Sequence, residues 1–154
     1  MKKLNYIIKE LEVVYNPTQK VNDNQKFSIK SSKTAAELLY NFYNINSISY
    51  QEEFLVLYVN NANNVIGIHQ HSKGGITYTS VDIRIIMATA LKCFATAIII
   101  SHNHPSGQLR PSAEDEVITL KIKKACKYFD ITLLDHIILI PSGEYYSFSD
   151  TGLL

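Results

Sequence analysis

The chain has 154 residues, of which 46% are hydrophobic, 10% aromatic and 19% charged. With 15 Lys+Arg against 14 Asp+Glu, the formal charge is 15 − 14 = +1, so charge alone does not demand a polyanionic partner. This length suits one domain with one sizeable core, and the apolar content excludes a disordered chain. The apolar middle of the sequence has no continuous apolar stretch of the roughly 20 residues that a membrane span needs.

The start of the chain does not read as a secretory signal. Lys9, Glu10 and Glu12 interrupt any apolar signal-peptide core. Cys93 and Cys126 lie in apolar surroundings without a Cys-x-x-Cys spacing, which is typical of small buried residues in a reducing compartment. The sequence therefore predicts a cytoplasmic protein without a membrane attachment.

The first 50 residues divide into a polar segment and a helix. Residues 1–30 are rich in Asn, Lys and Gln, and we interpret them as an N-terminal arm or edge segment that precedes a domain over 31–154. Ser31 and Ser32 then stand before apolar residues at helical spacing, as N-cap residues do. This pattern predicts a first helix near residues 33–43.

The middle of the chain alternates between strand and helix patterns. A β-rich run over 54–59, an Asn-rich turn and an apolar run over 65–69 predict a hairpin. After a turn at Gly74-Gly75, apolar residues recur at helical spacing and predict a second helix; they are Val81, Ile85, Ala88, Leu91 and Cys93. Residues 95–101 are β-branched and lack polar alternation, which indicates a strand buried on both faces.

The last third of the chain predicts a long helix and two strands. The helix covers 112–129, and its expected inner side consists of Val117, Leu120, Ala125 and Phe129. Strands are expected over 132–140 and 144–148. Interspersed helices and strands in so short a chain imply an α/β domain whose mixed sheet is flanked by helices.

Metal-competent residues gather directly after the buried strand. His102 and His104 project to the same side of a strand continuation because side chains alternate, and Asp115 on the next helix would add a third ligand. Catalytic zinc keeps three protein ligands and one position for water, so three ligands without cysteine indicate an open site suited to amide hydrolysis. The alternative is a chance histidine pair, with Ser112 and Asp115 only capping the helix.

The whole pattern resembles a family signature. It reads His-x-His-Pro and then Ser-x-x-Asp, with ten residues between the second His and the Asp, which is similar to the motif of the JAMM (MPN/JAB) metalloproteases. The sequence at 98–107, 134–138 and 146–148 resembles the RadC branch, in which an asparagine like Asn103 is the expected residue between the histidines. Longer RadC proteins carry an N-terminal helix-hairpin-helix region without a counterpart here, so the resemblance is to the JAB domain alone, over roughly residues 32–152.

The resemblance implies both a fold and an activity. The expected fold is a three-layer α/β sandwich of MPN/JAB type, similar to cytidine deaminases, with a mixed and curved sheet. The expected activity is that of a zinc-dependent metallopeptidase or isopeptidase. Its Zn²⁺ ligands would be His102, His104 and Asp115, with the attacking water in the fourth position.

Two further catalytic roles follow from the same resemblance. Ser112 would help to hold the oxyanion of the tetrahedral intermediate. The general base of the family is a glutamate on an upstream strand, and Glu52 matches it because it stands two residues before Phe54. Glu53 would point to the other face of that strand. From the residues alone, Glu52 and Glu53 would be interpreted as a solvent-exposed acidic pair at the start of a strand.

Five other positions carry weaker signals. His136, at the start of a buried strand, either orients a metal ligand or is a structural histidine. His69 and His71 have no carboxylate at ligand spacing and are expected on the surface or at a rim. Arg84 matches an arginine of RadC-like sequences, with an expected structural pairing to a carboxylate. Gly107 would permit either a close backbone approach or a turn.

The expected partner is a peptide or protein substrate, and a second function class remains open. RadC-like proteins carry a DNA-repair label, and residues 1–50 hold seven Lys against four Asp+Glu, an excess of 7 − 4 = +3. This small excess of positive charge is weak evidence for a nucleic-acid-binding accessory module, because residues 1–50 contain no Arg cluster. A zinc deaminase is excluded, since the His-x-Glu and Pro-Cys-x-x-Cys motifs are absent.

Overall fold

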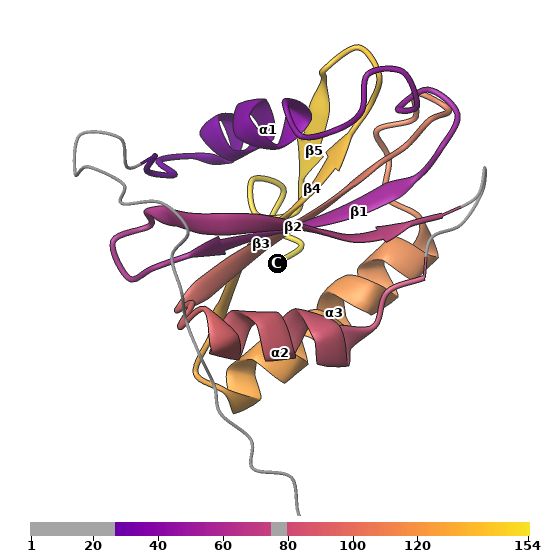
Figure 1. The fold of residues 1–154 in the computed structure, drawn as a ribbon. Coiled ribbons are helices and arrows are strands. Elements are labelled where there is room, and N and C mark those ends of the chain that lie inside the picture. Colours follow the sequence, from indigo (N-terminus) through magenta and orange to yellow (C-terminus); the bar gives the residue numbers. More distant parts are fainter. Residues whose placement is uncertain (1–26, 75–79) are drawn as a thin grey trace, which may run out of the picture.

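A five-stranded sheet forms the middle layer of the computed structural model, which describes residues 27–74 and 80–154 (Figure 1). The elements in chain order are α1 (Ser32–Tyr40), β1 (Glu53–Val59), β2 (Val65–Lys73), α2 (Ile83–Lys92), β3 (Ala97–Asn103), α3 (Ala113–Tyr128), β4 (Thr132–Leu139) and β5 (Tyr145–Ser147). Each expected helix and strand over these residues is present, with ends that differ by a few residues.

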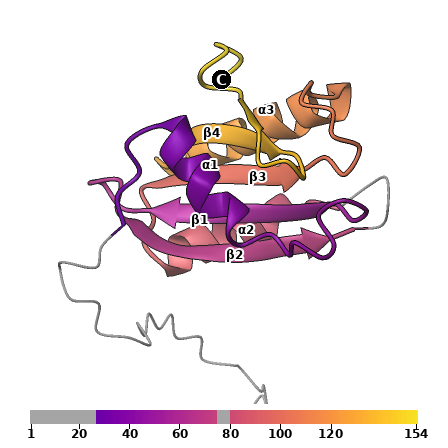
Figure 2. The same ribbon diagram turned by 90° about the horizontal axis from the view of Figure 1, so that it is seen from above.

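The sheet is mixed, with the strand order β2-β1-β3-β4-β5 (Figure 2). Only β3 and β4 pair in parallel, and α3 connects them, as a parallel connection requires. The β1–β2, β1–β3 and β4–β5 pairs are antiparallel. Strand β3 therefore lies at the centre, with its end beside the start of β1.

Helices cover both faces of the sheet, with α1 on one side and α2 and α3 on the other (Figure 1). Residues from α1 and one sheet face form one buried cluster, which includes Leu39, Leu57 and Ile99. Residues from α2, α3 and the opposite face form a second, which includes Ile86 and Ile122. This arrangement confirms the expected three-layer α/β fold with a mixed sheet.

The buried face of α3 differs from the predicted one, and α2 buries apolar residues other than those whose spacing predicted the helix. Helix α2 buries Ile86, Met87 and Ala90, whereas Ile85 and Leu91 are exposed. Helix α3 buries its stripe at Thr119, Ile122 and Cys126, whereas Val117, Leu120 and Phe129 are exposed. The face of α3 that packs on the sheet begins at Asp115 and continues through Thr119. Because these two residues are polar, this face looks less apolar in the sequence than the neighbouring face with Val117 and Leu120, but it is the one that faces the core.

Side-chain caps and turns define the ends of these elements. The Ser31 hydroxyl accepts a hydrogen bond from the Thr34 N–H at the start of α1, as expected of an N-cap serine. The Asn-rich turn between β1 and β2 is closed by the Asn60 side chain, whose Oδ1 accepts from Ala62 N and Asn64 N. Asn63 takes the left-handed backbone conformation with φ +55°, which Asn tolerates better than most residues.

The predicted N-terminal arm over residues 1–30 falls largely outside the described residues, as does Gly75 of the Gly74-Gly75 turn. The part of it that is described runs beside the hairpin turn. Ser28 forms an antiparallel bridge with Asn64, and Val65 N donates to Phe27 O. Within the described part of the chain, no helix is long and apolar enough to cross a bilayer.

Candidate metal centre

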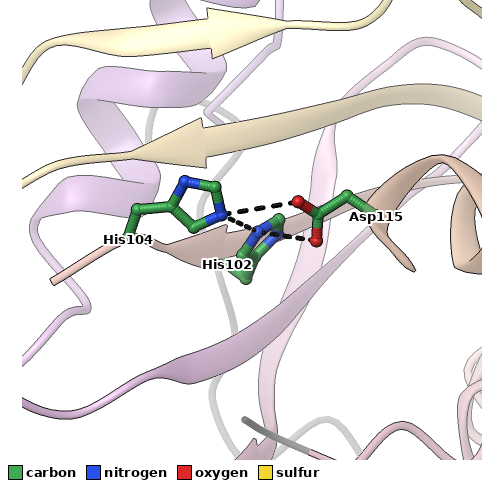
Figure 3. Close-up of side chains that lie close together, drawn as sticks. All are labelled: His102, His104 and Asp115. Atoms are coloured by element: carbon green, nitrogen blue, oxygen red, sulfur yellow. Dashed lines mark hydrogen bonds and ion pairs between the residues drawn. The ribbon is translucent and has the colours of Figure 1, made fainter. Parts of the chain in front are cut away.

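His102, His104 and Asp115 converge at the end of β3 (Figure 3). His102 lies in β3, His104 follows it directly, and Asp115 lies in the first turn of α3. The two histidine Nε2 atoms are 2.8 Å apart. The Asp115 carboxylate lies 3.1 Å from His102 Nε2 and 3.5 Å from His104 Nε2. The alternation of the strand and the start of the next helix thus bring the three side chains together.

A buried hydrogen-bond chain determines the tautomer of His102. The Thr119 hydroxyl donates its only proton to the Asp115 backbone carbonyl, so it must accept from His136 Nδ1, which lies 2.6 Å away. Complete burial lowers the pKa of His136 well below its ordinary value, so His136 is neutral and its Nε2 is an acceptor. His102 therefore donates from Nδ1 across 2.8 Å and keeps the lone pair on Nε2.

His104 has the same tautomer for a simpler reason. Its Nδ1 lies 2.7 Å from the Gln108 carbonyl oxygen, which only accepts, so Nδ1 carries the proton and Nε2 the lone pair. Two neutral imidazole lone pairs and a carboxylate then face one another, an arrangement that is repulsive without a proton or a cation between them. Tetrahedral zinc bonds of about 2.0–2.2 Å place ligand atoms about 3.4 Å apart. The three separations here are 2.8, 3.1 and 3.5 Å, so the two rings would move slightly apart to hold the ion. The donor set therefore fits a zinc ion.

The pKa shifts of His104 and Asp115 also favour a positive charge between these side chains. Burial by itself would lower the pKa of His104, but the hydrogen bonds to Asp115 and to the Gln108 carbonyl outweigh it and raise that pKa. Burial by itself would raise the pKa of Asp115, but the hydrogen bonds that His102 and His104 form with it when a proton occupies Nε2 hold that pKa far below its usual range. Asp115 is therefore a carboxylate at any ordinary pH, as a metal ligand must be.

Ser112 and Asp115 form a complete capping box at the start of α3. Asp115 N donates to the Ser112 hydroxyl at 3.1 Å, while Ser112 N donates back to Asp115 Oδ2 at 2.7 Å. The hydroxyl also donates to Asp115 Oδ2 at 2.7 Å. The capping interpretation of Ser112 is therefore correct, and the same contacts orient the Asp115 carboxylate toward the histidines.

Glu52 and Glu53 lie on opposite sides of the sheet. Glu52 lines a cavity of about 910 Å³ together with His102, His104, Ser112 and Asp115. Burial raises the pKa of Glu52, against the influence of His102 and His104, which lower it.

Glu53, by contrast, is 1% exposed and is held away from the cavity. Its carboxylate accepts from Ser47 Oγ and Gln70 Nε2 and pairs with Lys73. Of the two glutamates, only Glu52 faces the three converging side chains.

Thr119 and Gln108 were not anticipated from the sequence. Thr119 completes the chain that orients His102, and the Gln108 carbonyl orients His104. The spacing of Thr119, four residues after Asp115 on the same helix face, was the available signal. Gln108 acts through its backbone, which leaves no signal in the side-chain sequence.

The structure also places the positions with weaker signals. Arg84 pairs with Asp82, the N-cap residue of α2, as expected of a structural arginine. His69 and His71 are both half-buried, which agrees with the expected place on the surface or at a rim, and His71 Nε2 accepts from Asp82 N at 2.9 Å. Gly107 has φ +79° and no atom within 4 Å of an added Cβ, so the turn conformation, not a close approach, requires glycine there.

Comparisons with known proteins agree with the geometry. The family described as RadC-like JAB domain matches residues 29–153. A UPF0758 protein of Flavobacterium johnsoniae is 51% identical over 102 residues, which is 66% of this chain and 44% of the relative. UPF0758 proteins of Porphyromonas gingivalis and Pasteurella multocida are 44% and 41% identical over 104 residues, 68% of this chain and 46% of each relative. The chain thus spans less than half the length of these relatives, and it belongs to the RadC-like JAB domain family.

Proposed function

We propose that this domain is a zinc-dependent peptidase or isopeptidase. One observation carries the proposal: hydrogen bonds hold the lone pairs of His102 and His104 toward the Asp115 carboxylate, in a cavity that Glu52 also lines. A set of three ligands leaves a coordination position open, which is the arrangement of catalytic rather than structural zinc. When bound, zinc lowers the pKa of water and polarises a carbonyl group.

Glu52 would supply the proton transfers of the reaction. Its carboxylate would take a proton from the attacking water and deliver it to the leaving amine, which converts a poor leaving group into a neutral one. Partial burial raises the pKa of Glu52, which brings the pKa of the base closer to the pH at which it works.

Ser112 would assist at the carbonyl oxygen. Its hydroxyl proton points to Asp115 Oδ2, so stabilisation of an oxyanion requires the hydroxyl to turn that proton toward the substrate. An additional donor of this kind is worth about 10²–10³ in rate when it meets the developing charge. The capping bond from Asp115 N persists during this rotation, because it uses the lone pair of the hydroxyl.

The cavity suits a peptide or protein substrate. Its lining is mixed: Phe54, Val81 and Ile118 are apolar, whereas Arg110 and Lys121 are cationic. Such walls can contact both the side chains and the backbone of an extended peptide.

The first experiment measures zinc per chain in the purified protein, alongside His104→Ala and Asp115→Ala. We expect near-stoichiometric zinc that both variants lose. His69→Ala is the matched control, because His69 belongs to the other His-x-His pair of the chain, and it should keep the metal. A wild-type protein that takes up no zinc from a zinc-supplemented buffer would refute the proposal.

The second experiment measures hydrolysis of a library of peptides and lysine-linked isopeptides. Glu52→Gln should keep its zinc and lose about 10²–10⁴-fold in kcat. Glu53→Gln is the matched control, because its carboxylate lies on the other side of the sheet, and it should retain kcat. Full activity in the Glu52→Gln variant would exclude Glu52 as the base.

A second candidate function, nucleic-acid binding in a DNA-repair context, is supported by the second half of α3. Four lysines are exposed there, at positions 121, 123, 124 and 127. None of them forms an ion pair with another residue that the structure describes. Binding to duplex or single-stranded DNA should then weaken steeply between 50 and 200 mM salt, and also in the variant Lys123→Glu/Lys124→Glu. Absence of binding at low salt would exclude this function.

A further inference from the structure

Asn103 stands between the two histidines of the candidate metal centre, and its side chain is 0% exposed. Its amide group makes three hydrogen bonds to backbone atoms. Nδ2 donates to Ile48 O at 2.8 Å and to Gln51 O at 2.9 Å, and Oδ1 accepts from Glu53 N at 2.7 Å. One primary amide thus ties the end of β3 to the segment that leads into β1.

The Asn103 amide lies just beyond the end of the β1–β3 strand pairing. The pairing between β1 and β3 ends at Phe54 and His102. Beyond that pair, the Asn103 side chain connects the end of β3 to Ile48, Gln51 and Glu53.

Two of the three bonds flank Glu52. The Gln51 carbonyl belongs to the peptide plane before Glu52, and the Glu53 N–H belongs to the plane after it. Because peptide groups are planar, fixing both planes fixes the direction of the Cα–Cβ bond between them. Gly74 N also donates to Glu52 O at 2.8 Å, which holds the second plane from the side of β2.

We propose that Asn103 is a positioning residue that sets the location of the Glu52 carboxylate relative to His102 and His104. This inference rests on the proposed function of Glu52 as general base. Asn103 does not line the cavity, because alternation along β3 turns its side chain away from the face that carries the histidines. Its effect on the reaction is therefore exerted through Glu52.

The chemistry of the position requires a primary amide. The site needs two donors for two carbonyl oxygens and one acceptor for an N–H, which is the inventory of Asn. Asp would place a negative charge against both carbonyl groups, and Ser has a single proton to donate. Loss of the amide leaves a buried N–H and two buried carbonyls without these partners.

The test compares Asn103→Ala and Asn103→Ser with the wild type in zinc content, kcat and KM. We expect unchanged zinc content, KM within about threefold, and kcat reduced about 10–100-fold in Asn103→Ala, since small misplacements of a reacting group cost that much. Asn103→Ser, which keeps one donor, should fall between. Tyr43→Phe is the matched control: it removes another buried hydrogen bond to β3, at Ser101, and should retain kcat.

A double-mutant cycle separates positioning from general damage. When Glu52 is already Gln, Asn103→Ala should reduce kcat less than twofold further, because the group that it positions is gone. An equal loss in both backgrounds, or a wild-type kcat in Asn103→Ala, would overturn the inference.

Amide hydrogen exchange gives a readout that is independent of activity. In Asn103→Ala and Asn103→Ser, the Glu53 N–H should exchange at least tenfold faster, whereas Tyr43→Phe should leave it unchanged. Unchanged protection in both Asn103 variants would refute the inference. If the wild type hydrolyses no peptide but the Glu53 N–H exchanges faster in the Asn103 variants, the proposed function is refuted, whereas the positioning of Glu52 by Asn103 is supported.

Discussion

His102 Nδ1 and His136 Nε2 lie 2.8 Å apart in the core, and both rings are essentially inaccessible to solvent. His136 in turn donates to Thr119, whose proton goes to the backbone carbonyl of Asp115. The chain therefore begins at one proposed metal ligand and ends at another. Partners of this kind orient a ligand ring and determine its tautomer.

Thr119→Val should weaken zinc binding about 10–100-fold, the usual cost of losing such an outer partner. Valine has nearly the same shape but no hydroxyl, so His136 loses its acceptor at Nδ1. The imidazole can then place its proton on Nε2, which favours the tautomer of His102 that protonates the metal-facing nitrogen. The measurement is competition with a chromophoric chelator. Thr119→Ser, which restores the hydroxyl, should bind zinc within about threefold of wild type; equal weakening in both variants would contradict the hydrogen-bond chain.

The stability of the metal-free protein should depend on pH through His104 and Asp115. The raised pKa of His104 contributes stability that is present below the ordinary histidine pKa of 6.5 and is lost as pH rises through the raised value. The lowered pKa of Asp115 contributes stability that is present above 3.8 and is lost only as pH falls through the lowered value. In chelator, the Tm advantage of wild type over His104→Ala should therefore be larger at pH 5.5 than at pH 8.5.

Zinc should reverse that order. The ligands bind metal only when deprotonated, so zinc-derived stabilisation grows with pH. With zinc in excess, the Tm difference between wild type and His104→Ala should be larger at pH 8.5 than at pH 5.5. The same order of differences with and without zinc would contradict the assignment of His104 as a ligand.

Glu52→Gln should raise the Tm of the metal-free protein at pH 8. Because burial raises the pKa of Glu52, its contribution to stability is present below the ordinary value of 4.5 and is lost as pH rises through the raised pKa. The ionised side chain is therefore destabilising at pH 8, and glutamine removes that cost. Thermal unfolding at pH 4 should show a smaller difference; a lower Tm at pH 8 would show that the carboxylate stabilises the fold.

Ser112→Ala should combine a loss of stability with a loss of rate. Removal of an N-cap hydroxyl costs about 1 kcal/mol, which chemical denaturation can measure. Ser31→Ala is the control, since Ser31 caps α1 in the same way but lies outside the cavity lining. Both variants should lose similar stability, and only Ser112→Ala should lose kcat, by about 10²-fold. Equal kcat in the two would leave Ser112 with its capping role alone.

Local patterns were enough to predict the strands and helices and to suggest that the metal-competent residues converge, whereas the family resemblance was needed to choose this reading over a chance histidine pair beside a helix cap. Alternation along a strand puts His102 and His104 on one face, and a Ser-x-x-Asp start to the next helix puts Asp115 beside them. The same alternation separates Glu52 from Glu53. These relationships hold because strand geometry and helix capping act over a few residues, so neighbours in the sequence determine them.

Tertiary contacts decided the rest. The buried face of α3 runs through Thr119, Ile122 and Cys126 and not through Val117 and Leu120, because Ile122 and Cys126 pack in the core and the Thr119 hydroxyl contacts His136. The roles of His136 and Asn103 depend on partners 34 and 50 residues away in the chain, at His102 and Glu53. By itself the sequence determined which residues could bind a metal; only the packing of β1, β3, β4 and α3 determined which lone pairs and protons face one another, because hydrogen-bond direction depends on atoms that meet only in the folded chain.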